Sequence, residues 1–442
     1  MMADKTKIEW TDATWNPITG CSIVSPGCKN CYAMKLAGTR MKHHASRAGL
    51  TNPSKSGPVW NGQVRFNEQW LLQPLQQWKK PRMIFVCAHS DLFAEGVKDE
   101  WLDQIFAVMA LAPHHTFQVL TKRPERMRDY LTRGRWRPVL DFGQDERPSY
   151  WIAEAAGKLW SRLPSKNITV PNHVRTFGQE AHFQRSIKSE SLWPLPNVWL
   201  GVSVEDQRRA DERIPILLDT PAAIRWISAE PLLGPVDISR WTASANVTCK
   251  ACQKQFWLHE ADPCQHQETG DGWTLACPQC SACVCKPAWT EADARTMDMQ
   301  PPEHWIDRKV GRFSKVHPTI EVRSMIDWVV SGGESGLNAR PMHPDWARSL
   351  RDQCAAAGVP FLFKQWGAHL GGMAEDHGDG VFFNAASSSK HDRWLKKSEN
   401  FDWFDGLDAN ANGPMWLKVK KSEAGRLLDG VEHNSFPARR AV

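Results

Sequence analysis

This sequence of 442 residues has few tyrosines and no long apolar run. It contains 3 Tyr beside 23 Trp, an imbalance typical of a tryptophan-rich core and, less often, of aromatic platforms on which ligands stack. The longest apolar run, Ile105 to Ala112, is far shorter than the ~20 residues that a membrane-spanning helix needs. The first residues, Met1 to Trp15, are charged and contain no apolar stretch, which argues against a secretory signal and predicts a cytoplasmic protein.

Neither wholesale disorder nor a fibrous fold fits the composition, because hydrophobic residues make up 41% and charged residues 24% of the chain. The formal net charge of +6 permits binding to a nucleic acid or another polyanion without requiring it. No Walker A sequence occurs, which argues against hydrolysis of nucleoside triphosphates. We therefore expect a folded protein without a membrane span.

Six short apolar segments are typical of buried parallel strands, because they are rich in Val, Ile, Phe and Trp and do not alternate with polar residues. They are Met83–Ala88, Thr116–Leu120, Val198–Val204, Ala223–Ser228, Trp328–Ser331 and Pro360–Phe363. Helical patterns lie between them, for instance Asp99–Ala112 and a helix with Asp345 as N-cap that stops at Gly358. This alternation predicts an α/β fold with mostly parallel strands, either doubly wound or a partial or complete (β/α) barrel.

The pattern is interrupted twice, which suggests three parts. Residues 1–240 form the N-terminal part of the barrel, with an irregular excursion over 131–196 that includes a helix near Pro148–Leu163. Residues 241–317 form a discrete insertion with seven of the twelve cysteines, and residues 318–442 complete the barrel and form a tail.

Polar residues follow nearly every predicted strand, and the carboxyl ends of parallel strands meet at one edge of a sheet. They are His89, Ser90 and Asp91; Thr121, Lys122 and Arg123; Ser203 and Glu205; Ser228 and Glu230; Ser331, Gly332, Gly333 and Glu334; Lys364 and Gln365. We interpret them as one polar cavity, with Glu205, Glu230, Lys122 and Lys364 as candidate catalytic residues and Ser203 as a cofactor contact. The alternative is that these residues cap helices and solvate loops.

Three cysteines lie close together near the start of the chain, in the spacing C-x6-C-x2-C formed by Cys21, Cys28 and Cys31. Three thiolates in such a loop can bind three irons of a [4Fe–4S] cluster and leave the fourth iron open. The alternative is a structural zinc site completed by His43, His44 or Cys87.

A second set of cysteines in the insertion has the paired C-x2-C spacing of a structural zinc site. The four expected ligands are Cys249, Cys252, Cys277 and Cys280. His259, Cys264, His266, Cys283 and Cys285 remain, and are enough for a second zinc ion or a different ligand set. The insertion is expected to contact substrate or a partner protein.

Five segments, in the same order, resemble the phage-encoded three-cysteine-motif family, which has no established biochemical function and is similar to the radical S-adenosylmethionine enzymes. They are Cys21–Ala33, Val198–Glu205, Ser228–Pro235, Ser331–Gly336 and Phe361–Gly367. The resemblance covers residues 1–130, 197–240 and 318–442 and leaves out the cysteine-rich insertion.

For radical S-adenosylmethionine enzymes, the resemblance implies a partial (β/α) barrel, a cluster on Cys21, Cys28 and Cys31, and an electron donor. It also implies that Gly332, Gly333 and Glu334 contact the methionine amino group of S-adenosylmethionine. Three features depart from that pattern: the first cysteine spacing is six rather than three, Asn30 replaces an aromatic residue, and the Gly-Gly-Glu segment lies far downstream. That segment is therefore expected to bind either cofactor or substrate.

The positive charge, the cysteine-rich insertion and the phage association together suggest a polyanionic substrate, such as DNA, RNA or a nucleotide, that is modified or repaired. Basic residues close to the first three cysteines support a polyanionic substrate, although such a run of charges is more commonly a solvated helix face. They are Lys29, Lys35, Arg40, Lys42, His43, His44 and Arg47. One alternative is a noncatalytic nucleic-acid-binding protein with structural zinc. The other is a metal-dependent nuclease or hydrolase that uses Asp91, Glu205, Glu230 and Glu334.

Overall fold

A computed structural model of the full chain describes most of residues 8–133, 194–242, 325–376 and 413–438, together with separate shorter segments. Within these ranges, residue 337 is outside the description. The shorter segments are residues 6, 380–388, 390 and 392–396 and the remaining helices and strands named below.

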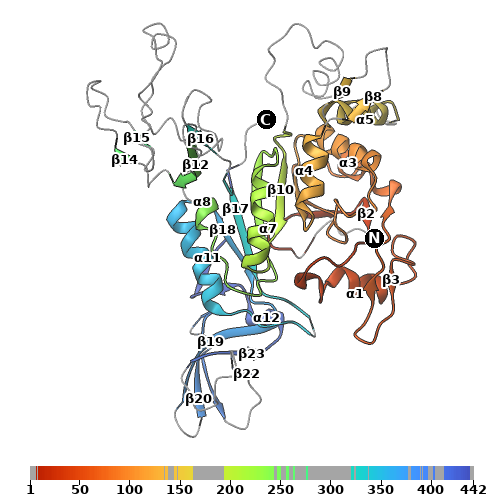
Figure 1. The fold of residues 1–442 in the computed structure, drawn as a ribbon. Helices are drawn as coiled ribbons and strands as arrows, with labels where there is room; N and C mark the ends of the chain where they lie inside the picture. Colours follow the sequence, from red (N-terminus) through yellow and green to blue (C-terminus); the bar gives the residue numbers. More distant parts are fainter. Residues whose placement is uncertain are drawn as a thin grey trace.

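Seven parallel strands form one sheet that curls into a half-barrel surrounded by helices, which confirms the predicted fold class (Figure 1). Their spatial order follows their order in the chain: β1 (Ala13–Trp15), β6 (Met83–Val86), β7 (Thr116–Thr121), β10 (Val198–Ser203), β11 (Ile224–Ala229), β17 (Trp328–Gly332) and β18 (Phe361–Gln365). All six predicted strands are present, and the three-residue strand β1 is an addition at the edge beside β6.

Helices connect successive strands and cover the outer face of the sheet, as crossovers between parallel strands require (Figure 1). They are α3 (Asp99–Leu111), α4 (Pro124–Thr132), α7 (Gln207–Leu218), α8 (Ser239–Thr242) and α11 (Pro344–Ala357). Helix α11 ends at Gly358, whose φ of 65° is left-handed, as predicted. The predicted N-cap was wrong, because His343 takes that position and its ring nitrogen accepts a hydrogen bond from the Asp345 amide.

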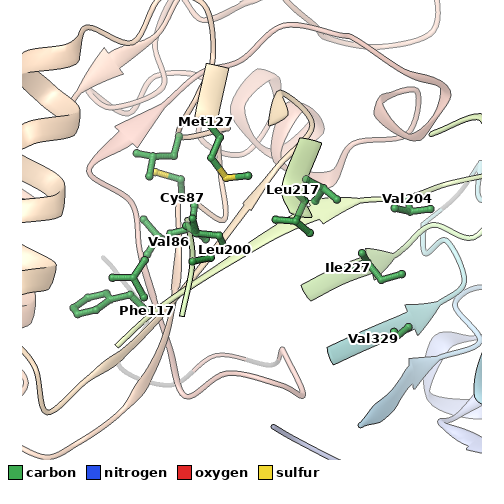
Figure 2. Packing of buried hydrophobic residues seen from close by; sticks show 14 of the residues in the cluster. Val86, Cys87, Phe117, Met127, Leu200, Val204, Leu217, Ile227 and Val329 are labelled. Atoms are coloured by element: carbon green, nitrogen blue, oxygen red, sulfur yellow. The ribbon is translucent and has the colours of Figure 1, made fainter. Parts of the chain in front are cut away.

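The outer face of the sheet packs against these helices in one large hydrophobic core. Figure 2 shows part of it: Val86, Phe117, Leu200, Ile227 and Val329 come from five neighbouring strands. These side chains are buried almost completely, as expected for strands that are covered on both faces.

The inner face carries a separate aromatic cluster, which confirms the expected role of tryptophan in the core. Trp10 lies edge to face against Trp226 and Trp328, with ring centroids 5.3 and 6.3 Å apart. Gly201 makes room for the Trp226 indole, because a Cβ at that position would lie 2.5 Å from the ring. The cluster fills the half-barrel below the carboxyl edge of the sheet.

The excursion after α4 contains the helix predicted near Pro148–Leu163, observed as α5 (Pro148–Arg162). Its Ile152, Ala156 and Leu159 join the main core. A short hairpin, β8 (Arg135–Arg137) with β9 (Gln144–Glu146), precedes it.

The cysteine-rich insertion leaves and re-enters the half-barrel at one place, where the Ile326 amide donates a 3.1 Å hydrogen bond to the Trp241 carbonyl. Its described strands are β12 (Asn246–Cys249), β13 (Gln255–Trp257), β14 (Asp262–Pro263), β15 (Leu275–Ala276) and β16 (Ile320–Val322). Of the predicted zinc ligands, Cys252, Cys277 and Cys280 lie outside the described residues, as do His259, Cys264, His266, Cys283 and Cys285. The zinc site therefore stays a prediction.

After the half-barrel the chain forms a five-stranded antiparallel sheet that our sequence analysis missed. Its spatial order is β21 (Arg393–Lys396), β20 (Gly380–Ala385), β19 (His369–Asp376), β23 (Gly413–Lys418) and β22 (Asp402–Trp403). Phe383 and Met415 anchor it to the main core.

Small elements complete the described chain. They are β2 (Ile18–Thr19), η1 (Pro26–Cys28), α1 (Tyr32–Gly38), β3 (Thr51–Asn52), β4 (Val59–Trp60), β5 (Arg65–Phe66), η2 (Glu68–Trp70), α2 (Gln73–Gln76), α12 (Lys421–Ala424), β24 (Leu427–Leu428) and β25 (Val431–Glu432). Among the described helices, none has the length and apolar character to cross a membrane.

Candidate functional site

The three cysteines lie in the segment Gly20–Cys31, which we call the cysteine loop, and it follows β1 and β2 at the carboxyl edge of the sheet. A bridge between Gly20 and Ser90 ties its start to the segment after β6. Inside the loop, the Cys28 amide donates to the Ser25 carbonyl at 2.9 Å, and the Cys31 amide donates to the Cys28 carbonyl at 3.2 Å. These turns lead directly into α1.

All three thiols are partly buried, and Cys21 and Cys31 pack against the same small apolar cluster around α1. Burial, and then the charge of Asp91, raise the pKa of Cys21 to about 12; Cys28 and Cys31 add to this rise and Arg123 opposes it. The three thiols are thus close enough to influence one another. Within the described part of the chain, however, no three His, Cys, Asp or Glu side chains form a group that could hold a metal ion.

Arg123, at the end of β7, is the first anchor of the cysteine loop. Its Nη1 lies 3.7 Å from Cys21 Sγ and 3.0 Å from Asp91 Oδ2, and its Nη2 donates to the Ser22 carbonyl at 3.2 Å. Its Nε donates to Glu95 at 2.8 Å, and, although burial opposes the shift, this bond holds the pKa of Glu95 at about 2. A buried guanidinium therefore fixes Cys21 and its neighbour.

Asp91 holds this anchor in place rather than facing an open cavity. Its carboxylate accepts from Thr121 Oγ1 at 2.7 Å, from the Phe93 amide at 3.0 Å and from the Lys122 amide at 2.9 Å, besides Arg123. It is 6% exposed, so its acceptor positions are occupied by the protein.

Glu205, after β10, is the second anchor and lies directly beneath the loop. Its fully buried carboxylate accepts from Ser25 Oγ and, at 2.7 Å, from Arg213 Nη1, while Lys122 Nζ lies 3.9 Å away. Burial opposes ionisation, but Lys122, Arg213 and Ser25 together lower the pKa of Glu205 below its usual value. Gly27 passes so close that a Cβ there would lie 2.5 Å from the carboxylate.

Glu334, after β17, is the third anchor. Its Oε2 accepts from Asn30 Nδ2 at 2.9 Å, and Arg340 binds the carboxylate through both its backbone amide and its guanidinium, at 2.8–3.0 Å. Arg340 Nη2 also donates to the Pro26 carbonyl at 3.0 Å. Although burial opposes it, these bonds lower the pKa of Glu334. The Gly-Gly-Glu segment thus contacts the cysteine loop itself.

Gly332 and Gly333 have a packing role where β17 and β18 end. The Gly333 amide donates to the Gln365 carbonyl at 2.9 Å, and a Cβ on Gly333 would lie 2.0 Å from the Trp366 carbonyl oxygen. Any larger residue at 333 would force these two backbones apart.

The remaining predicted catalytic residues lie across the mouth of the half-barrel. Lys364 Nζ binds both oxygens of Glu230, at 2.6 and 2.9 Å, and both side chains are partly exposed. Ser203 is buried, its carbonyl accepts from Arg213 at 2.8 Å, and it lies in register with Ser228. Lys122 is partly exposed between the Glu205 and Arg123 anchors.

The predicted convergence of strand ends is therefore present, and it includes Cys21, Cys28 and Cys31. Sequence reasoning missed Ser25, Arg213 and Arg340, which complete the anchors. Arg213 follows Glu205 by two helical turns, which the pattern of α7 could have suggested. Arg340 lies in a loop without periodicity and gave no such signal.

Comparison with known proteins adds a family but no activity. No curated protein and no solved structure matches the chain. A family model described as "Protein of unknown function (DUF5131)" matches residues 5–437, which is nearly the whole chain. The chain, with its half-barrel and cysteine loop, therefore belongs to the DUF5131 family, whose function is unknown.

Proposed function

We propose that this protein is an iron–sulfur enzyme of radical S-adenosylmethionine type that modifies or repairs a nucleic acid or nucleotide. One observation carries the proposal: side chains from three strand ends hold the cysteine loop over the carboxyl edge of a half-barrel. Arg123, Glu205 and Glu334 make these contacts. The carboxyl edge is where α/β sheets and barrels place their active sites.

Cys21, Cys28 and Cys31 match the ligand number of a [4Fe–4S] cluster with one open iron. Two sulfur ligands of one tetrahedral zinc ion lie about 3.8 Å apart, since each Zn–S bond is about 2.3 Å. In a [4Fe–4S] cluster each cysteine binds a different iron, so the sulfurs can lie farther apart while sharing one pocket. Cys21, Cys28 and Cys31 supply three such ligands from one loop, whereas a structural zinc ion would need a fourth ligand from elsewhere.

When bound, the cluster would supply the electron that cleaves S-adenosylmethionine to a carbon radical. The protein's own residues would do the rest. Arg123 would donate to the sulfur of Cys21 and offset negative charge there. Lys122 and the Glu230–Lys364 pair would form polar walls for substrate or cofactor, and the tryptophan cluster closes the floor to water.

A metal-dependent nuclease or hydrolase is less well supported, because each proposed carboxylate already has a cationic partner. Asp91 binds Arg123, Glu205 binds Arg213, Glu230 binds Lys364 and Glu334 binds Arg340. Hard metal ions need carboxylate oxygens that are free to coordinate.

The insertion extends the proposal to a second metal. Cys249, Cys252, Cys277 and Cys280 would hold a structural zinc ion, which would stabilise the insertion without taking part in chemistry. The noncatalytic alternative, a nucleic-acid-binding protein, requires zinc at Cys21, Cys28 and Cys31 as well.

The test is anaerobic quantification of iron, sulfide and zinc in the purified and reconstituted full chain. Electron paramagnetic resonance spectra of the reduced protein follow, with and without S-adenosylmethionine. We expect a reducible cluster whose spectrum changes on addition of S-adenosylmethionine and which is lost in Cys28→Ala. Cys354→Ala is the matched control, because Cys354 is fully buried in α11 and belongs to the main core.

Zinc bound by Cys21, Cys28 and Cys31 in place of iron would overturn the radical proposal in favour of the binding protein. Activity on DNA that needs only Mg²⁺ or Mn²⁺ and survives Cys28→Ala would instead favour the hydrolase.

A further inference from the structure

Tyr32, the first residue of α1, combines an exposed ring with an anchored hydroxyl. The residue is 54% exposed, yet its hydroxyl donates a hydrogen bond to the Ala88 carbonyl after β6. The His89 ring packs against it at a centroid distance of 6.0 Å and an angle of 71°. Burial of the hydroxyl raises the pKa of Tyr32. The ring is thus held in one position with its surface open.

His89 is itself fixed from behind by the buried side chain of Arg47, which bonds to its Nδ1. Burial, and then the charge of Arg47, lower the pKa of His89 to about 4, so the imidazole is neutral near pH 7. A neutral ring beside Tyr32 adds no charge to the surface that Tyr32 presents. Its support is therefore a neutral ring that a buried cation holds in place.

The position of Tyr32 is at the mouth of the half-barrel. Cys31 precedes it, and both Cys31 and Glu230 lie near enough for their charges to contribute to the raised pKa. Tyr32 contacts the segment after β6, whereas Glu230 follows β11, and β7 and β10 lie between these strands in the sheet. The ring consequently lies between opposite parts of the mouth, beside the cysteine loop.

The segment that carries this ring is basic. Residues 13–67 contain no Asp or Glu, and their cations are Lys29, Lys35, Arg40, Lys42, Arg47, Lys55 and Arg65. Four of these, Lys29, Arg40, Lys42 and Lys55, are exposed. An open aromatic ring within a basic surface is the combination that binds unpaired bases of single-stranded nucleic acid, through stacking and phosphate contacts.

We infer that Tyr32 is a stacking platform for an unpaired nucleobase of the substrate, which the exposed lysine and arginine residues of the same segment hold by its phosphates. This inference rests on the proposed function, because it assumes that the substrate is a nucleic acid or nucleotide. Binding of a nucleobase by Tyr32 does not require that a cluster is present. Tyr32 is separate from the position before Cys31, where Asn30 is bound to Glu334.

The experiment measures binding of a fluorescein-labelled, mixed-sequence 15-nucleotide single strand, as DNA and as RNA, to the full chain by fluorescence anisotropy. Tyr32→Leu is expected to weaken binding by about fivefold to 150-fold, the value of one stacked base, without changing the salt dependence. Tyr32→Phe keeps the ring and should stay within about threefold of the wild type. Phe436→Leu is the matched control, because Phe436 is an exposed aromatic residue that packs on Trp328.

Lys29→Gln should act differently, since it removes a charge: the slope of log affinity against log salt should fall by about 0.7. A second measurement uses the wild type alone, in case Tyr32→Leu does not fold. Photocrosslinking of a 5-iodouracil-substituted strand should label the peptide that contains Tyr32.

Unchanged affinity in Tyr32→Leu, no binding by the wild type, or crosslinks only to other peptides would each overturn the inference. So would loss of the S-adenosylmethionine-dependent spectral change with unaltered strand binding, because the ring would then serve the cofactor. Iron content is measured separately, so failure of the cluster proposal would leave these results interpretable.

Discussion

Replacing Glu205 by glutamine removes one charge from the centre of the candidate site and keeps the size of the side chain. The carboxylate is fully buried between Arg213, whose side chain is 6% exposed, and Ser25 of the cysteine loop. In the variant, the buried guanidinium of Arg213 keeps only neutral acceptors, which are the Ser203 carbonyl and the glutamine amide oxygen. Breaking one side of a buried ion pair costs about 3–5 kcal/mol, so we expect a loss of that size in the free energy of unfolding.

The pH dependence of the same variant has a defined sign. The pKa of Glu205 is lower in the folded state than in the unfolded state, so its stabilisation is fully present above the unfolded-state pKa. It is lost as the pH falls through the lower, folded-state pKa. The difference in stability between wild type and Glu205→Gln should therefore shrink in acid and reach its full size near neutral pH.

Urea denaturation followed by circular dichroism measures both effects. Glu212→Gln is the control, since the Arg208–Glu212 pair is on the surface and its loss should leave the stability almost unchanged. Combining Glu205→Gln with Arg213→Met should recover part of the loss, because no unpaired charge remains. A Glu205→Gln protein with wild-type stability and no activity would refute this reasoning and restore Glu205 as a catalytic residue.

Three further substitutions test two contacts of the cysteine loop and the neutral state of His89. Gly27→Ala should displace the cysteine loop and lower the iron retained after reconstitution, since its Cβ would lie 2.5 Å from Glu205. Gly157→Ala is the control: no atom lies within 4 Å of the new methyl group, so the free energy of unfolding should be unchanged or slightly higher. In the wild type, burial keeps the native His89 imidazole neutral while the unfolded one binds a proton, so stability should fall by about 1–3 kcal/mol between pH 6.5 and about 4. His89→Gln should flatten this decline. A variant with the same slope as the wild type would contradict the reasoning. Arg340→Gln should speed amide hydrogen exchange in residues 25–31 by at least tenfold, and equal exchange would show that Glu334 holds the loop alone.

Much of the fold could be predicted because buried parallel strands are continuous apolar runs, and Thr116–Thr121 or Val198–Ser203 are of this kind. Strand β1 was not predicted because Ala13–Trp15 is only three residues long, and its register is set by pairing with Ile84 and Val86 of the neighbouring strand. The antiparallel sheet was missed although residues 376–380, at the junction of β19 and β20, are rich in Gly and Asp, a composition typical of hairpins.

The candidate site was predictable in its location but not in its pairings. Parallel topology alone places Lys122, Glu205 and Glu334 at one edge, because successive strand ends share that edge. Which cation each carboxylate binds depends on side-chain packing several residues away, as for Arg213 in α7. Our prediction that Glu205, Glu230, Lys122 and Lys364 are catalytic, and that Ser203 binds a cofactor, stays a prediction.

The hydrogen bond between Trp241 and Ile326 means that the cysteine-rich insertion starts and ends at a single point. A segment whose ends already touch can be shortened, exchanged or removed without stretching the chain that remains. Strands β11 and β17 pair directly with each other on either side of it, so their register does not depend on what lies between. The pairing of β11 with β17 can therefore be kept when the insertion changes in length or sequence.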